Sequence, residues 1–187
     1  MSTSTKKIAS TAMAEFQRYR YIRENQVPLS TRIPDYWAAT PSAFTSVAIA
    51  WSAVFVSWCV KQGGAGATDF AYSARHSVYV HAAINDSPSS AGFTGHAPAT
   101  YVPKVGDILQ NNRSGNTFAF EYARRKTSYE SHAAVVIEVG SDNAGKYLRT
   151  IGGNEGDSVG LKEVRLSAGG TVRNGSGLYI AVLECKL

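Results

Sequence analysis

The sequence predicts an α+β protein in which N-terminal helices pack on a small antiparallel sheet. Apolar residues recur at helical spacing in the first half of the chain, and short β-rich runs between turn signals fill the second half from Val105 on. The length of 187 residues, without an internal repeat or a dividing linker, fits one domain with a real core. We therefore expect a single domain over residues 1–187, with residues 1–44 as an N-terminal helical extension.

Three helices are expected. The first covers Lys7–Asn25, where apolar residues recur every three or four positions with charges between them. Residues 27–44 contain three prolines and show no clear period, so we expect an ordered loop there. A second helix begins near Trp51 and ends at a glycine-rich stretch, and a third covers Tyr72–Ile84.

The second half is expected to supply the strands. Each candidate run is rich in β-branched or aromatic residues: GDILQ, TFAFEYA, HAAVVIEVG, KYLRTIGG, GLKEVRL and GLYIAVLEC. Turn-forming stretches such as NNRSGN and GSDNAGK separate these runs. In the stretch VGDIL we expect the side chain of Asp107 to anchor a turn rather than to take part in catalysis.

The composition indicates which kinds of protein and which partners are compatible with this chain. Hydrophobic residues make up 44% of the chain and charged residues 18%, which indicates a globular protein. The net charge of +5 favours an anionic partner. The basic residues are scattered and no P-loop, zinc-finger or RNA-binding signature accompanies them, so nucleic acid is disfavoured. No apolar run reaches the ~18 residues needed to span a bilayer. Two cysteines are too few for a zinc site, so we expect no metal and no cofactor.

The apolar stretch AWSAVFVSWCV contains two candidate nucleophiles. Ser52 lies in the first turn of the expected helix, where backbone N–H groups are unpaired and the helix dipole is positive. Cys59 lies on the same face two turns deeper, ~10 Å away, and should be embedded in the core. Ser52 is therefore the candidate nucleophile, and the alternative is that it caps the helix or fills a small packing position.

A base and an orienting group follow later in the chain. His132 opens the run HAAVVIEVG, so it can face a cleft while the body of the strand is buried. The next run ends in Gly-Gly-Asn-Glu, and the carbonyl of Asn154 could accept a hydrogen bond from the imidazole of His132. Glu155 is the alternative orienting residue.

Four motifs occur in a recognisable order: W-S-A-V-F-V-S-W, P-K-V-G-D-I-L, S-H-A-A-V-V-I-E-V and I-G-G-N. Together they resemble the papain-like peptidoglycan hydrolases of the CHAP and NlpC type over Trp51–Val159. They resemble more closely an uncharacterised bacterial branch of that group, in which W-S-A replaces W-C-A. The resemblance implies a papain-like fold and hydrolysis of an amide bond in peptidoglycan peptide, by an endopeptidase or amidase. In that mechanism Ser52 attacks, His132 is base and then acid, and Asn154 orients the imidazole.

The resemblance also implies the surroundings of the site. Trp51, His76 and Glu155 are expected to line the substrate cleft, and the alternative for His76 is a surface or first-turn histidine. The expected partner is bacterial peptidoglycan, with an immunity or delivery protein as a further partner. The start of the chain lacks the apolar core of a secretory signal, so synthesis in the cytoplasm is expected. The protein would then reach the envelope after lysis, as a phage lysin, or by injection, as an antibacterial effector.

One residue departs from the pattern of the resembled hydrolases, which use a cysteine nucleophile. A papain-like thiol works as a thiolate paired with an imidazolium, whereas a serine hydroxyl needs a neutral His132 to take its proton during attack. Three explanations stay open. The site is a working Ser-His-Asn hydrolase, or a catalytically inactive module that binds the cell wall, or a cysteine hydrolase inactivated by a Cys-to-Ser replacement.

Overall fold

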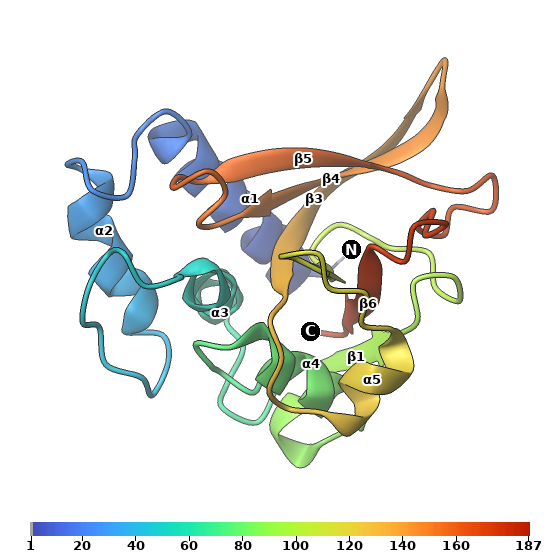
Figure 1. Cartoon of the computed structure of the whole chain (residues 1–187), viewed down its shortest axis with the longest axis horizontal. Coiled ribbons are helices and arrows are strands. Elements are labelled where there is room, and N and C mark those ends of the chain that lie inside the picture. The colour runs from blue at the N-terminus through green and yellow to red at the C-terminus, as the bar shows by residue number, and fades with distance from the viewer. Residues whose placement is uncertain (1) are drawn as a thin grey trace.

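The computed structural model, which describes residues 2–187, is an α+β protein (Figure 1). Its elements in chain order are α1 Thr3–Tyr19, α2 Leu29–Trp37, α3 Ser52–Gln62, α4 His76–Ile84, a short 3-10 helix Pro88–Ser90, β1 Phe93–His96, β2 Ile108–Asn111, α5 Phe120–Arg125, β3 His132–Asp142, β4 Gly145–Gly152, β5 Gly160–Arg165 and β6 Tyr179–Cys185. The strands form one sheet in the order β1-β6-β2-β3-β4-β5, and every neighbouring pair is antiparallel. The predicted α+β class and antiparallel sheet are confirmed.

Helix α3 lies at the centre of the helical part and fixes the position of Ser52. It contacts α1, α2 and β3, and most of its side chains are buried because the segment is apolar on nearly every side. Tyr36 packs edge-on against Phe55, with ring centroids 5.3 Å apart, and stacks on Trp51 at 5.8 Å. The amino end of α3 is therefore held on several sides by packed rings.

The N-terminal segment belongs to this same core. Ile8 of α1 and Ile33 of α2 are fully buried in one cluster with Phe55 of α3 and Val135 of β3. Between α1 and α2, buried Glu15 accepts hydrogen bonds from Arg32 and Tyr36. Within residues 2–187, no helix is both long enough and apolar enough to cross a membrane.

The first and third expected helices are shorter than predicted. Helix α1 ends at Tyr19 rather than Asn25 because the following residues turn toward the loop between β4 and β5, where the backbone N–H of Glu24 donates to the carbonyl of Asp157 at 2.6 Å. Helix α4 begins at His76 rather than Tyr72, since Arg75 before it has an extended backbone. The second expected helix and its end near Gln62 are confirmed.

The expected loop at residues 27–44 contains helix α2, so that prediction is wrong. Its buried residues Leu29, Ile33, Tyr36 and Trp37 follow helical spacing and face the core. Pro34 lies inside the helix, and its missing N–H removes only one bond from a helix of nine residues. The gain from burying this apolar face outweighs the lost hydrogen bond.

The strand predicted at TFAFEYA is also wrong, since Phe120–Arg125 forms helix α5. The aromatic rings alternate as in a strand, yet Phe118 and Tyr122 stack with centroids 4.4 Å apart, and Glu121 pairs with Arg124 at 2.7 Å. Such contacts join residues three and four apart, as a helix requires. Strand β1, which pairs with β6, lies before Val105, where no strand was expected.

Asp107 has the turn-anchoring role expected of it. Its carboxylate accepts hydrogen bonds from the backbone N–H groups of Lys104 at 2.7 Å and Cys185 at 2.9 Å. These contacts tie the start of β2 to the end of β6.

Candidate functional site

Ser52 is the first residue of α3, and its neighbour Trp51 fixes where the helix starts. The indole Nε1–H of Trp51 donates to Glu24 Oε2 at 2.8 Å, and Trp51 is fully buried. The Trp51 side chain makes no capping hydrogen bond, so the N–H groups of the first turn remain available to a ligand. One expectation and one alternative are corrected. Trp51 supports the helix from within the core instead of lining a cleft, and Ser52 is not the capping residue.

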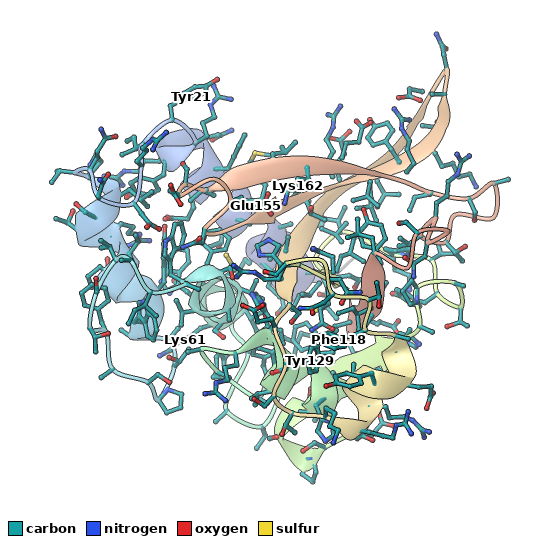
Figure 2. The ribbon with its side chains drawn as sticks, viewed as in Figure 1. Tyr21, Lys61, Phe118, Tyr129, Glu155 and Lys162 are labelled. Atoms are coloured by element: carbon teal, nitrogen blue, oxygen red, sulfur yellow. The ribbon has the colours of Figure 1, made fainter. Side chains whose placement is uncertain are left out.

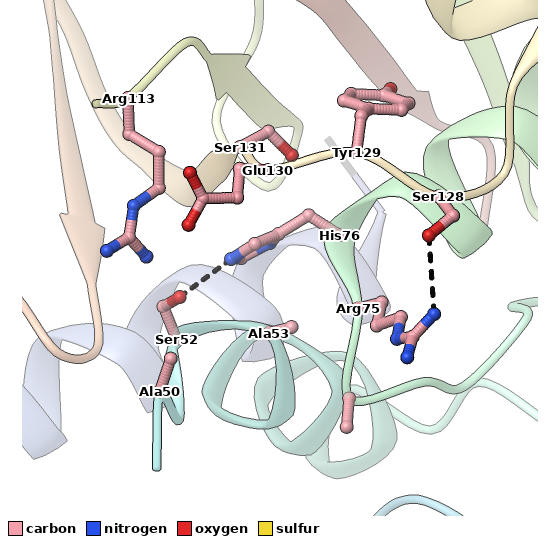
Figure 3. A pocket seen from close by; sticks show the side chains of 11 residues that line it. Ala50, Ser52, Ala53, Arg75, His76, Arg113, Ser128, Tyr129, Glu130 and Ser131 are labelled. Atoms are coloured by element: carbon pink, nitrogen blue, oxygen red, sulfur yellow. Dashed lines mark hydrogen bonds between the residues drawn. The ribbon is translucent and has the colours of Figure 1, made fainter. Parts of the chain in front are cut away.

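The hydroxyl of Ser52 meets a histidine. Ser52 Oγ lies 2.7 Å from His76 Nε2 (Figure 3). The other ring nitrogen, Nδ1, is hydrogen-bonded to the hydroxyl of Tyr79 one turn further along α4. Burial lowers the pKa of His76 well below its usual value, and the nearby His132 and Arg113 lower it further. His76 is therefore neutral, and it is a central member of the site rather than a surface residue.

His132, the first residue of β3, lies beside this pair. The rings of His132 and His76 meet edge-on with centroids 5.6 Å apart. His132 Nε2 is 2.8 Å from Glu155 Oε1, and Glu155 Oε2 is 3.0 Å from Lys162 Nζ of β5 (Figure 2). Burial raises the pKa of Glu155, but His132 and Lys162 outweigh burial and hold it below its usual value. Glu155 is thus an ionised carboxylate that can only accept hydrogen bonds.

Two glycines let the end of β4 lie between these groups. A Cβ on Gly152 would be 2.8 Å from His132 Nε2, and a Cβ on Gly153 would be 2.6 Å from both Phe55 Cβ and Trp51 Cζ3. Real Cβ atoms essentially never approach other heavy atoms so closely. The Gly-Gly pair therefore brings His132 and the start of α3 together.

Asn154 does not orient His132, so that expectation is wrong. Its backbone is in the left-handed region, with φ at 54°, and its amide donates to Glu24 Oε2 at 3.0 Å. Glu24 thereby joins Trp51 and Asn154 and ties the loop after β4 to the start of α3. Glu155, the alternative named above, holds His132.

A hollow of about 450 Å³ opens at Ser52 (Figure 3). Ser52 and His76 line it together with Arg75, Arg113 and Glu130. A second hollow of about 290 Å³ lies on the side of His132 and Glu155, and Arg113 also lines that one. Arg113 is exposed, and no ion pair with it is found among residues 2–187. The mouth of the site thus presents a guanidinium group to whatever binds.

Sequence reasoning missed three members of the site, namely Tyr79, Arg113 and Glu24. Tyr79 lies three residues after His76, so a helix over this stretch could have suggested their contact. Glu24 and Arg113 carry no such signal because they reach the site from distant segments of the chain.

Cys59 is buried, as predicted, with no exposed surface, and burial raises its pKa well above the usual value. A protonated thiol without access to solvent is a poor nucleophile. In the described part of the chain, no group of three or more His, Cys, Asp or Glu residues is placed to hold a metal ion.

Comparison of the chain with known protein families gives one match. The profile of one family, described as "Uncharacterized protein conserved in bacteria (DUF2272)", matches residues 11–182. No curated protein and no solved structure matches the chain.

Proposed function

This chain belongs to the bacterial DUF2272 family, and we propose that it hydrolyses an amide bond in peptidoglycan peptide, as an endopeptidase or amidase, with Ser52 as nucleophile. The observation that carries the proposal is the position of Ser52 Oγ, 2.7 Å from a neutral imidazole at the uncapped amino end of α3 and open to a hollow. A serine hydroxyl beside histidines and free N–H groups is an arrangement that acyl transfer uses.

The chemistry is a two-step displacement. Ser52 Oγ attacks the carbonyl carbon while a neighbouring imidazole takes the hydroxyl proton, and the N–H groups at the start of α3 hold the oxyanion. The carbon–nitrogen bond then breaks as the imidazole returns this proton to the leaving amine. Water attacks the Ser52 ester in the second step, which releases a carboxylic acid and restores the hydroxyl.

The substrate class and the papain-like character of the fold rest on the motif resemblance over Trp51–Val159. What the site adds in their support is coarser: Ser52 at the start of α3 meets His76 at the start of α4, and His132 at the start of β3 lies beside His76. The net charge of +5 favours an anionic polymer such as the bacterial cell wall. Delivery to the envelope by lysis or injection, and an immunity or delivery protein as partner, are parts of the same proposal.

Digestion of purified peptidoglycan, read by mass spectrometry, tests this function. The wild-type protein should release fragments with one new amine and one new carboxylate per cut. The Ser52→Ala variant should release none, since triad-type nucleophiles contribute at least ~10⁴-fold to kcat. Ser10→Ala, an exposed change on α1, is the matched control and should cut like wild type.

The alternative is an inactive module that binds the cell wall, which the serine in place of cysteine motivates. It would replace our proposal if wild type, Ser52→Ala and Ser52→Cys all bind peptidoglycan and release no fragment. Hydrolysis by Ser52→Cys alone would identify the site as a cysteine hydrolase inactivated by a Cys-to-Ser replacement.

A further inference from the structure

Two imidazoles lie at the site: His76 is beside Ser52, and His132 is beside His76. In each ring, the hydrogen-bond partner of one nitrogen determines which nitrogen carries the ring proton. For His132 that partner is Glu155, an ionised carboxylate at 2.8 Å that can only accept. His132 Nε2 must therefore carry the proton. In the neutral ring Nδ1 is then a bare lone pair, and no hydrogen bond to it is found within residues 2–187.

For His76 the partner is a donor. The Tyr79 side chain is fully buried, and in the described part of the chain its hydroxyl has one hydrogen-bond partner, His76 Nδ1. Burial raises the pKa of Tyr79, so the hydroxyl keeps its proton. A buried hydroxyl proton without an acceptor is unfavourable, so Tyr79 donates to His76 Nδ1. The ring proton of His76 is then on Nε2, which points at Ser52 Oγ.

We propose that the two histidines have opposite roles: His76, held by Tyr79, donates a hydrogen bond to Ser52 Oγ, and His132, held by Glu155, is the general base that takes the Ser52 proton. Because His76 donates to Oγ, the hydroxyl proton of Ser52 is free to point to another acceptor. The bare Nδ1 of His132 is that acceptor. This inference rests on the proposed function for the transfer itself, while the two proton positions stand without it.

Ser52 and His132 share no hydrogen bond in the described structure, and their link is the edge-on contact between the two rings. Catalytic hydrogen bonds often tighten only when substrate is bound, so a gap before binding is compatible with this role. The charged groups around His132 are Glu155 from the loop after β4, Lys162 of β5 and Arg113 after β2. The carboxylate of Glu155 stabilises the imidazolium that forms when His132 takes the proton.

In this division of roles Tyr79 is a positioning residue that acts through His76. The Nε2–H of His76 also stays in place after Ser52 loses its proton. There it stabilises the negative charge that develops near Oγ. His76 is then a catalytic residue although it never accepts a proton.

Nitrogen-15 NMR of the full-length protein without substrate tests the proton positions directly, at neutral to mildly alkaline pH. Both histidines should show a protonated Nε2 and an unprotonated Nδ1. In Tyr79→Phe the Nδ1 resonance of His76 should shift, because it loses its donor, while that of His132 should not. A protonated Nδ1 on His76 in the wild-type protein would overturn the inference.

Glutamine variants separate a donor from a base, because the amide nitrogen of glutamine can donate a hydrogen bond but cannot accept a proton. His132→Gln should lower kcat at least ~100-fold, as loss of a general base does. His76→Gln should stay within about tenfold of wild type, and His76→Ala should fall below it. Equal losses in His76→Gln and His132→Gln, with both variants folded, would contradict the assigned roles. If the wild-type protein hydrolyses nothing, the proposed function fails, and the NMR spectra still decide the proton positions.

Discussion

His76 is buried beside Ser52, and no ion pair between its ring and a carboxylate is found within residues 2–187. Its hydrogen-bond partners are Ser52 and Tyr79, burial lowers its pKa, and the neighbouring His132 and Arg113 lower it further. The folded protein therefore keeps His76 neutral to a lower pH than the unfolded chain does. This difference links the site to the stability of the fold.

We predict that stability falls in mild acid through His76. The unfolded chain protonates His76 near the ordinary value of 6.5, so below that pH the unfolded state binds more protons than the folded state. The contribution is complete above pH 6.5 and is lost as the pH falls, by up to ~1.4 kcal/mol per pH unit. Urea unfolding of wild type and His76→Gln between about pH 6.5 and 5 should show a shallower slope for the variant. Parallel curves would mean that His76 carries its charge inside the fold.

Glu155 affects the stability of the fold in a different pH range. Its folded pKa lies below the ordinary value of 4.5, so its contribution is present above that pH and is lost as the pH falls below it. The range used for His76 therefore stays clear of Glu155, and the two effects can be separated.

At this scale the sequence brought Ser52 and His132 into one site, but it missed that His76 is the histidine hydrogen-bonded to Ser52 and that Glu155 is the residue that holds His132. Ser52 and His132 each open an element whose apolar run is visible in the sequence, so their positions follow from the element boundaries. Asn154 and Glu155 are adjacent in an irregular loop, and either could face His132. The left-handed backbone at Asn154 directs its amide to Glu24, and no sequence pattern indicates such a turn.

At the scale of elements, the end of β4 and the start of α3 are joined through Gly153. We predict that Gly153→Ala destabilises the protein by about 1–3 kcal/mol, because its Cβ would overlap Phe55 and Trp51 at 2.6 Å. Gly175→Ala is the matched control, since nothing lies within 4 Å of its Cβ position, and it should stay within about 0.5 kcal/mol of wild type. Urea unfolding measures both. If Gly153→Ala is as stable as Gly175→Ala, a methyl group fits beside Phe55 and Trp51, and the close contact at Gly153 is contradicted.

The two helices that sequence reasoning missed share one physical cause. Helices α2 and α5 are short, and local composition opposed them, with Pro34 inside α2 and alternating aromatic residues around α5. Tertiary packing decides such segments, through the apolar face of α2 and the aromatic stack of Phe118 on Tyr122. The longer elements α3, β3 and β4 were predicted because burial and local pattern agree in them.

At the scale of the whole molecule, the site is assembled from four separate parts of the chain. Ser52 comes from α3, His76 from α4, His132 from β3 and Glu155 from the loop after β4. None of these groups is reactive alone, since an isolated serine hydroxyl is a weak nucleophile. Reactivity at Ser52 is therefore expected only in the folded protein.

Covalent labelling with a fluorophosphonate, which reacts with activated serine hydroxyls, tests the central claim most directly. Peptide mapping by mass spectrometry should place one adduct on Ser52 in the native protein. The adduct should be absent from urea-unfolded protein and from Ser52→Ala, and it should form much more slowly in His132→Gln. An adduct on another residue, or cleavage of peptidoglycan by a protein whose Ser52 stays unlabelled, would contradict the account.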